Sequence, residues 1–210
     1  MPELSPRRAK FLPFAAMLTE QMIEYGRPKK IVFSAFGVRE GLILSKLTAK
    51  EKSYDGLIEG CCDLIRVIGR SPEYGFELDN WLKPLFANVD EEKQRLILAA
   101  CILSDISCYE NTEYRGEMAY RRVMDSSLIG LTHSQRAFIA QVLYYRYNAI
   151  DKDGVLSEPI VVLLDKQDLQ LAKVLGSGMR LARSLSGSHV GVLKHIPIDM
   201  IKDKLVITFA

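Results

Sequence analysis

The chain has 210 residues, of which 48% are hydrophobic and 26% are charged, and its formal net charge is +2. This ordinary globular composition excludes a disordered, collagen-like or disulfide-stapled chain. No apolar run approaches the roughly 20 residues of a membrane-spanning helix, and the near balance of charge does not indicate nucleic-acid binding. We therefore expect a cytoplasmic protein with neither a membrane nor a nucleic acid as its partner.

The amino-terminal part predicts a helix, a strand and a second helix. Apolar side chains recur every three or four residues over 5–25, which is typical of one helix face, and Gly26 and Pro28 then end the helix. The run KKIVFSAFG at 29–37 is rich in β-branched and aromatic residues and predicts a strand. Helical spacing returns over 38–47. This order is that of an α/β fragment.

Residues 52–148 predict five helices with short connections. An apolar stripe over 57–68 indicates the first, and EYRGEMAYRRVMD at 113–125 is the fourth. The other three begin at capping signals, which are Ser71-Pro72, Asp90 and the capping box Thr132-x-x-Gln135. Helices in such close succession predict a compact helical domain.

The last sixty residues change character. A turn-rich connection is followed by a predicted strand at 160–164 and a predicted helix at 165–186. Two further strands are predicted at 190–198 and 204–209, joined by a tight turn around Lys202-Asp203-Lys204. This segment predicts a small α/β unit, so we expect a mainly α (α+β) fold. The net charge also changes sign near residues 50 and 150, which suggests three segments.

Motifs for catalysis or metal binding are weak. The three histidines do not stand in a metal-ligand spacing, and the four cysteines form no C-x-x-C pair, so we expect buried free thiols. Asp151-Lys152-Asp153-Gly154 begins like a calcium loop, but the spacing to a glutamate fails. Gly176-Ser177-Gly178 lacks the rest of a phosphate loop and favours close helix packing.

Several whole segments carry a resemblance to a known family. SAFGVREGLIL at 34–44, with its R-E-G triplet from Arg39 to Gly41, resembles the end of the second actin-like domain in the exopolyphosphatase and guanosine pentaphosphate phosphohydrolase family. The segments at 69–86, 104–123 and 179–186 extend the similarity over nearly all of the chain.

The resemblance implies three parts. Residues 1–45 would be the remnant of the second actin-like lobe, 46–150 an HD-like helical domain, and 151–210 a small C-terminal α/β unit. The family's catalytic loops and magnesium site lie in its amino-terminal lobes, and none of their motifs occurs here. The resemblance therefore implies magnesium for the intact enzyme, and neither a cofactor nor a catalytic residue in this chain.

The helical domain of the family is similar to HD phosphohydrolases, whose metal ligands are histidines and aspartates. The first ligand would fall near Tyr74, the histidine-aspartate pair on Ser104-Asp105, and a later histidine within 114–117. Of these positions only Asp105 carries a residue of the ligand type, and a single carboxylate cannot hold a metal ion. The HD chemistry is therefore expected to be lost.

Two functions follow as hypotheses. In the favoured one, the chain is a non-catalytic module that dimerises and guides polyphosphate or guanosine pentaphosphate to an active site elsewhere. In the alternative, it is an independent, divergent HD-type metal-dependent nucleotide phosphohydrolase that uses Asp105. Guidance of a polyanion requires basic side chains. The candidate anion-binding residues are Arg66, Arg70, Arg115, Arg121, Arg122, Arg180 and Arg183.

The amino-terminal segment also predicts a homodimer. A strand at 29–37 without a neighbour would leave its backbone N–H and C=O groups unpaired. The helix at 5–25 would likewise leave its apolar stripe in water. We therefore expect either this segment or the helical domain to form the contact between two copies.

Overall fold

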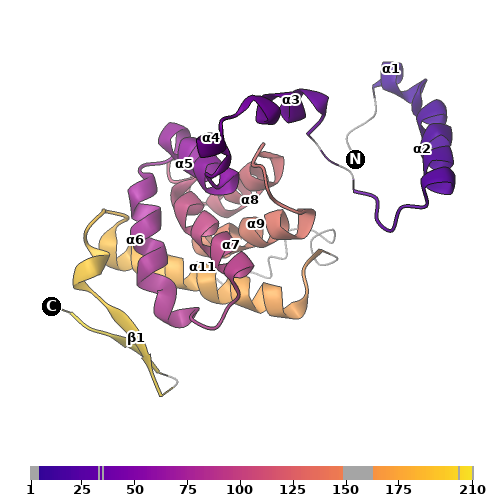
Figure 1. Ribbon diagram of the computed structural model, residues 1–210. Coiled ribbons are helices and arrows are strands. Elements are labelled where there is room, and N and C mark those ends of the chain that lie inside the picture. Colours follow the sequence, from indigo (N-terminus) through magenta and orange to yellow (C-terminus); the bar gives the residue numbers. More distant parts are fainter. Residues whose placement is uncertain (1–4, 33, 35, 149–162, 203, 210) are drawn as a thin grey trace. The chain divides into compact units, whose positions relative to one another are not determined.

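A computed structural model describes residues 5–32, 34, 36–148, 163–202 and 204–209. The chain divides into two compact units, Met1–Lys52 and Ser53–Ala210. Figure 1 shows the elements of both units, which are mainly helical as the sequence predicts. No helix among the described residues is long and apolar enough to cross a membrane.

The amino-terminal unit consists of helices that bury nothing. It contains α1 (Pro6–Ala9), α2 (Leu12–Gly26), α3 (Val38–Lys46) and α4 (Ala49–Lys52). Helix α2 ends where the sequence predicts, because Arg27 adopts a left-handed conformation with φ of 42°. None of the described residues between 5 and 52 is buried.

The predicted strand at 29–37 is wrong. None of its described residues (29–32, 34, 36 and 37) lies in a strand. The physical reason is that no second strand of the described chain pairs with this run, and an extended segment forms a sheet only where its N–H and C=O groups find partners.

The carboxy-terminal unit is a helical bundle with a hairpin at its edge. Its long helices are α5 (Gly56–Ile68), α6 (Pro72–Leu82), α7 (Glu91–Ile102), α8 (Arg115–Asp125), α9 (His133–Tyr147) and α11 (Lys166–Ser186). Among the described residues, 3-10 turns follow α6 at Lys83–Leu85 and α7 at Leu103–Asp105, and another lies between α11 and the hairpin at Leu193–His195. The boundaries of three parts at 45/46 and 150/151 stay a prediction.

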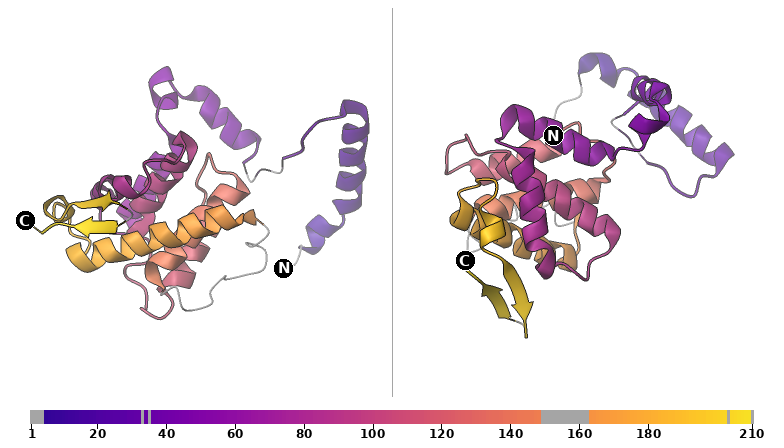
Figure 2. Two further views of the ribbon diagram at one scale, coloured as in Figure 1. Left: turned by 90° about the horizontal axis from the view of Figure 1, so that it is seen from below. Right: turned by 60° about the vertical axis from the view of Figure 1, so that its left-hand side comes forward.

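Helix α9 is the centre of this unit. It packs against α8, α7 and α11, and every residue from Ala137 to Arg146 is buried. Figure 2 shows the long α11, coloured orange, lying beside the other helices. Gly75 of α6 allows a close approach to α7, since a Cβ there would lie 2.3 Å from the Cα of Ile102.

All three predicted helix starts are confirmed, and two of the three cap side chains bind the helix backbone. The Asp90 carboxylate accepts a bond from the Lys93 N–H at 2.7 Å, and Thr132 and Gln135 form the reciprocal capping box. Ser71 does stand at the start of α6, but its hydroxyl binds the Glu73 carboxylate and caps no backbone group.

The carboxy-terminal strands differ in part from the prediction. Strand β1 (Ile198–Ile201) pairs antiparallel with β2 (Lys204–Ile207), with Ile201 opposite Lys204, so the predicted pair of strands around 202–204 is present, although Asp203 itself lies outside the described residues. The strand predicted at 190–198 is wrong, because a 3-10 turn occupies 193–195. Of the strand predicted at 160–164, residues 160–162 lie outside the described residues, as does the connection at 151–159, and 163–164 are not in a strand.

Candidate functional site

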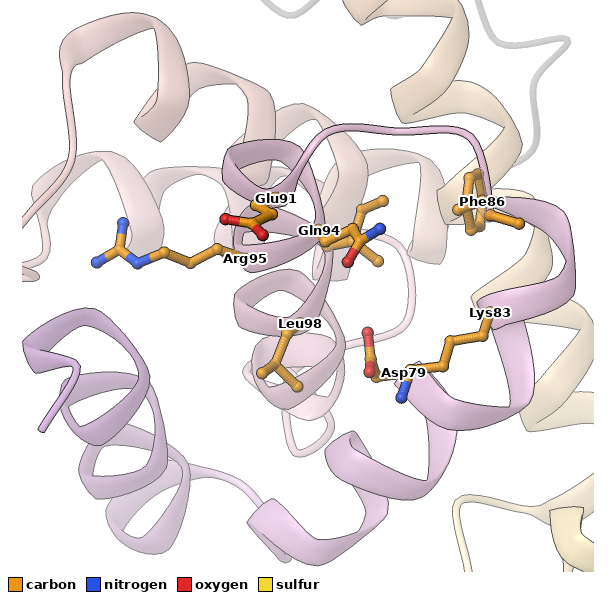
Figure 3. Close-up of a pocket in the computed structure, with 9 residues that line it drawn as sticks. Asp79, Lys83, Phe86, Glu91, Gln94, Arg95 and Leu98 are labelled. Atoms are coloured by element: carbon orange, nitrogen blue, oxygen red, sulfur yellow. The ribbon is translucent and has the colours of Figure 1, made fainter.

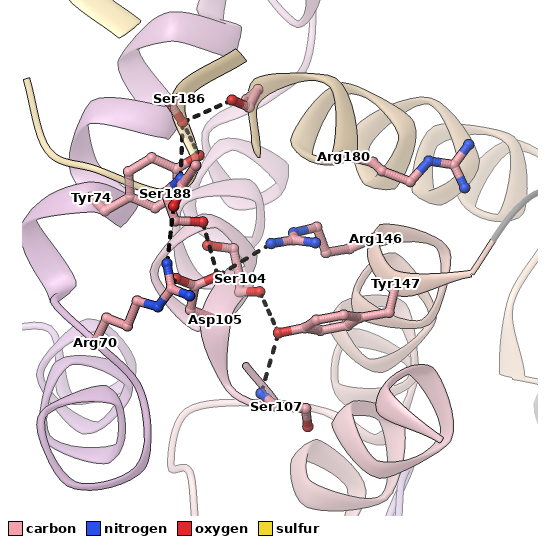
Figure 4. A network of polar contacts seen from close by, with 12 residues as sticks. Arg70, Tyr74, Ser104, Asp105, Ser107, Arg146, Tyr147, Arg180, Ser186 and Ser188 are labelled. Carbon is pink, nitrogen blue, oxygen red and sulfur yellow. Dashed lines mark hydrogen bonds and ion pairs between the residues drawn. The ribbon is translucent and has the colours of Figure 1, made fainter. Parts of the chain in front are cut away.

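Asp105, the carboxylate that the sequence singled out, lies buried at the end of the 3-10 turn after α7. It is 3% exposed. Its Oδ1 accepts hydrogen bonds from Nη2 of Arg146 and from Oγ of Ser188, each at 3.2 Å, and Nε of Arg70 lies 3.8 Å from its Oδ2 (Figure 4). We call these four residues the Asp105 cluster. The carboxylate is thus neutralised by two guanidinium groups.

Arg146 is the member of the Asp105 cluster that sequence reasoning missed. It lies at the end of α9 and is 2% exposed, and its guanidinium carbon lies 4.6 Å from the centre of the Tyr147 ring. Burial lowers the pKa of Arg146, yet a guanidinium stays protonated in proteins. A charge buried this deeply requires an opposite charge, which Asp105 provides.

The loop after α11 brings the third member of the cluster into place. Ser188 has a φ of 61°, which is uncommon for a residue with a side chain. Its N–H donates to Oγ of Ser186 at 3.2 Å while its own Oγ donates to Asp105. Two buried hydrogen bonds therefore hold a backbone conformation that is unfavourable by itself.

Two tyrosines surround the cluster. The hydroxyl of Tyr74 lies 3.1 Å from Oγ of Ser186, and burial raises the pKa of Tyr74. The hydroxyl of Tyr147 donates to the carbonyl of Ser104 at 2.9 Å and accepts from the N–H of Ser107 at 3.2 Å. Burial raises the pKa of Tyr147 to about 12, so its hydroxyl stays protonated and fixes the turn that carries Asp105.

The structure brings together two of the three positions that the resemblance marks as HD ligand positions. Tyr74 and the Ser104-Asp105 pair belong to one buried hydrogen-bonded region (Figure 4), whereas in the segment 114–117 both Tyr114 and Glu117 are exposed. No group of three or more histidine, cysteine, aspartate or glutamate residues in the described chain could hold a metal ion. The Asp105 carboxylate faces guanidinium groups, so these residues do not fit a metal.

The cysteines are not nucleophiles. All four are buried free thiols, as expected. Burial raises the pKa of Cys61 to about 12 and that of Cys101 well above its ordinary value, so neither forms a thiolate readily.

Five of the seven candidate anion-binding arginines already bind the protein itself. Arg66 pairs with Asp63, Arg70 donates to the Gly187 carbonyl, Arg115 to the Glu110 carbonyl, Arg122 to the Ile106 carbonyl and the Glu110 carboxylate, and Arg180 to the Asn148 carbonyl. Arg121 and Arg183 have no hydrogen bond or ion pair to another described side chain. The five bound arginines therefore have fewer free donors for a ligand.

One comparison with known proteins identifies the family. The family model described as exopolyphosphatase, C-terminal, matches residues 57–208. No curated protein matches the chain. The matched residues begin in α5 and end just after β2, and they make up most of the sequence. The chain therefore belongs to the exopolyphosphatase C-terminal family.

Proposed function

We propose that this chain is a non-catalytic module of an exopolyphosphatase-like phosphohydrolase that releases phosphate from polyphosphate or guanosine pentaphosphate. The Asp105 cluster is the observation that carries this proposal. A carboxylate that contacts two arginines and a serine is not free to bind a metal ion or to activate water. The magnesium of the intact enzyme would then be bound outside this chain. The module's own roles would be dimerisation and guidance of the polyanion.

A phosphate-release assay tests the non-catalytic role. The chain is incubated with polyphosphate, and separately with a nucleoside triphosphate, in magnesium or manganese. We expect background release from the wild type, from Asp105→Asn and from the matched control Asp63→Asn, an exposed aspartate of α5. Turnover that Asp105→Asn abolishes and Asp63→Asn retains would overturn the proposal and favour the HD-type hydrolase.

Guidance of a polyanion would depend first on Arg121 and Arg183, because their guanidinium donors are not used within the described fold. We expect a weak affinity for long-chain polyphosphate that falls as salt rises, since salt screens exposed charges over about 8–10 Å. The double variant Arg121→Ala and Arg183→Ala should bind several-fold more weakly. Arg66→Ala, which removes a charge already paired with Asp63, should bind as the wild type does. Equal binding by all three proteins would contradict the role of these two arginines.

Dimerisation is supported by α2 rather than by the strand that the sequence predicted. The apolar stripe of this helix is in water, with Phe14 69% and Leu18 63% exposed. A second copy would cover such a stripe. Sedimentation at micromolar concentration should show a dimer for the wild type and for Ala16→Glu, which changes the opposite face of α2. Leu18→Glu should be monomeric. A monomeric wild type would contradict the dimer proposal.

A further inference from the structure

A pocket of about 520 Å³ lies between α6 and α7, within the carboxy-terminal unit (Figure 3). Its apolar wall includes Phe86, Ile97 and Leu98. Its polar side chains are Asp79, Lys83, Glu91, Gln94 and Arg95. Mostly apolar walls with a few polar groups are typical of small-molecule sites.

Asp79 is a carboxylate of this pocket that has no hydrogen-bond or ion-pair partner among the described residues. It lies partly buried on α6 and points toward the α7 side of the pocket (Figure 3). No hydrogen bond or ion pair joins its carboxylate to any residue that the structure describes. Burial is the main cause of its raised pKa, and nearby Lys83 opposes that rise only in part. The burial of the carboxylate is thus only partly compensated by Lys83, and a bound cation would relieve the remaining cost.

The two cationic groups of the pocket differ: Arg95 pairs with Asp55, whereas Lys83 lies near Asp79. The Arg95 guanidinium makes two hydrogen bonds to the Asp55 carboxylate, at 2.5 and 2.7 Å, and another to the carbonyl of Gly130. The ammonium of Lys83 lies 3.4 Å from Oδ1 of Asn80. These bonds use three of the five N–H donors of Arg95 and direct its guanidinium toward Asp55 and Gly130 rather than toward Asp79.

The remaining polar group at the wall is an acceptor. Nε2 of Gln94 donates to the carbonyl of Val89 at 3.1 Å, so Oε1 of Gln94 can accept a hydrogen bond from a ligand. Glu91 adds a second carboxylate that has no partner among the described residues. The pocket therefore combines apolar walls with acceptors and a local excess of negative charge.

We propose that this pocket binds a small primary amine, with its ammonium at the Asp79 carboxylate and its apolar body against Phe86, Ile97 and Leu98. An ammonium group has three donors and no acceptor, which complements the carboxylate and the Gln94 oxygen. The walls remove the apolar body from water. The inference concerns a different surface from the Asp105 cluster and does not depend on the proposed function.

The test compares benzylamine with benzyl alcohol, which has nearly the same shape and no charge. Both are titrated into the chain, and amide chemical shifts report the site and the affinity. We expect benzylamine to shift amides of α6 and α7 and to bind at least about tenfold more tightly than the alcohol, because only the ammonium adds a positive charge to its hydrogen bond with the carboxylate. Asp79→Asn should remove this preference, whereas Glu113→Gln, the same charge change at an exposed position, should retain it.

The variant Lys83→Met tests whether Lys83 already pairs with Asp79 in solution. If the proposal holds, this variant binds benzylamine more tightly than the wild type, because a competing cation is gone. Binding by Lys83→Met with none by the wild type would show that Lys83 occupies Asp79 in solution, and would overturn the proposal. Equal affinity for the amine and the alcohol, or unchanged binding in Asp79→Asn with native helicity, would also overturn it.

Discussion

Helices α2 and α9 each have 15 residues, yet they differ in what covers them. Helix α9 buries an unbroken run from Ala137 to Arg146, whereas α2 buries no residue. The first lies among α7, α8 and α11, and the second belongs to a unit without a buried core. Apolar spacing therefore makes a helix amphipathic, whereas the stability of the helix comes from the surfaces that bury it.

The largest effect should follow from removing Arg146. Arg146→Ala leaves the Asp105 carboxylate buried beside the single, more distant Arg70, and we expect a loss of about 3–5 kcal/mol in the free energy of unfolding. Arg66→Ala breaks an exposed pair and should cost less than about 1 kcal/mol. Urea unfolding measures both. Equal losses would show that burial does not distinguish the two pairs.

A smaller effect should follow from replacing a helical glycine by alanine, and its sign should differ between the two units. Gly75→Ala places a methyl group against the backbone of Ile102, and we expect a loss of about 1–3 kcal/mol from overpacking. Gly41→Ala in α3 meets no atom within 4 Å and should stabilise its helix by up to about 1 kcal/mol. Thermal unfolding followed by circular dichroism checks the opposite signs, and a loss at both glycines would mean that the amino-terminal unit is also closely packed.

An effect confined to alkaline pH concerns Tyr147. Its pKa is raised from about 10 to about 12 in the folded protein, so the folded state retains this proton more tightly than the unfolded state. The corresponding stability is complete below pH 10 and is lost as the pH rises toward 12. Tyr147→Phe should therefore lose less stability than the wild type between pH 10 and 12. Parallel losses in urea titrations across that range would contradict this assignment.

The predictable features were those that depend on local chemistry. The caps at Asp90 and Thr132 were found from sequence because the acceptor and the N–H it binds are three residues apart. The strand at 29–37 was wrong because a strand depends on a partner that the local sequence does not specify.

The site was predictable only in part for the same reason. Asp105 was singled out, but its partner Arg146 is 41 residues away and follows two tyrosines at a helix end, where an arginine is usually solvated. A usable signal was the nearly continuous apolar run of α9, since an arginine that continues such a run needs an acidic partner. Among the candidate arginines, hydrogen bonds to distant carbonyls such as Gly187 and Asn148 could not be read from spacing.

Amide hydrogen exchange at two protein concentrations distinguishes a helix covered by its own core from a helix covered by a second copy of the chain. We expect slow exchange in α9, which lies within the core of residues 53–210, at both concentrations. In α2 we expect fast exchange at a concentration well below that of dimerisation and slower exchange above it. Protection of α2 that equals that of α9 and does not change with concentration would show that α2 is not covered by association.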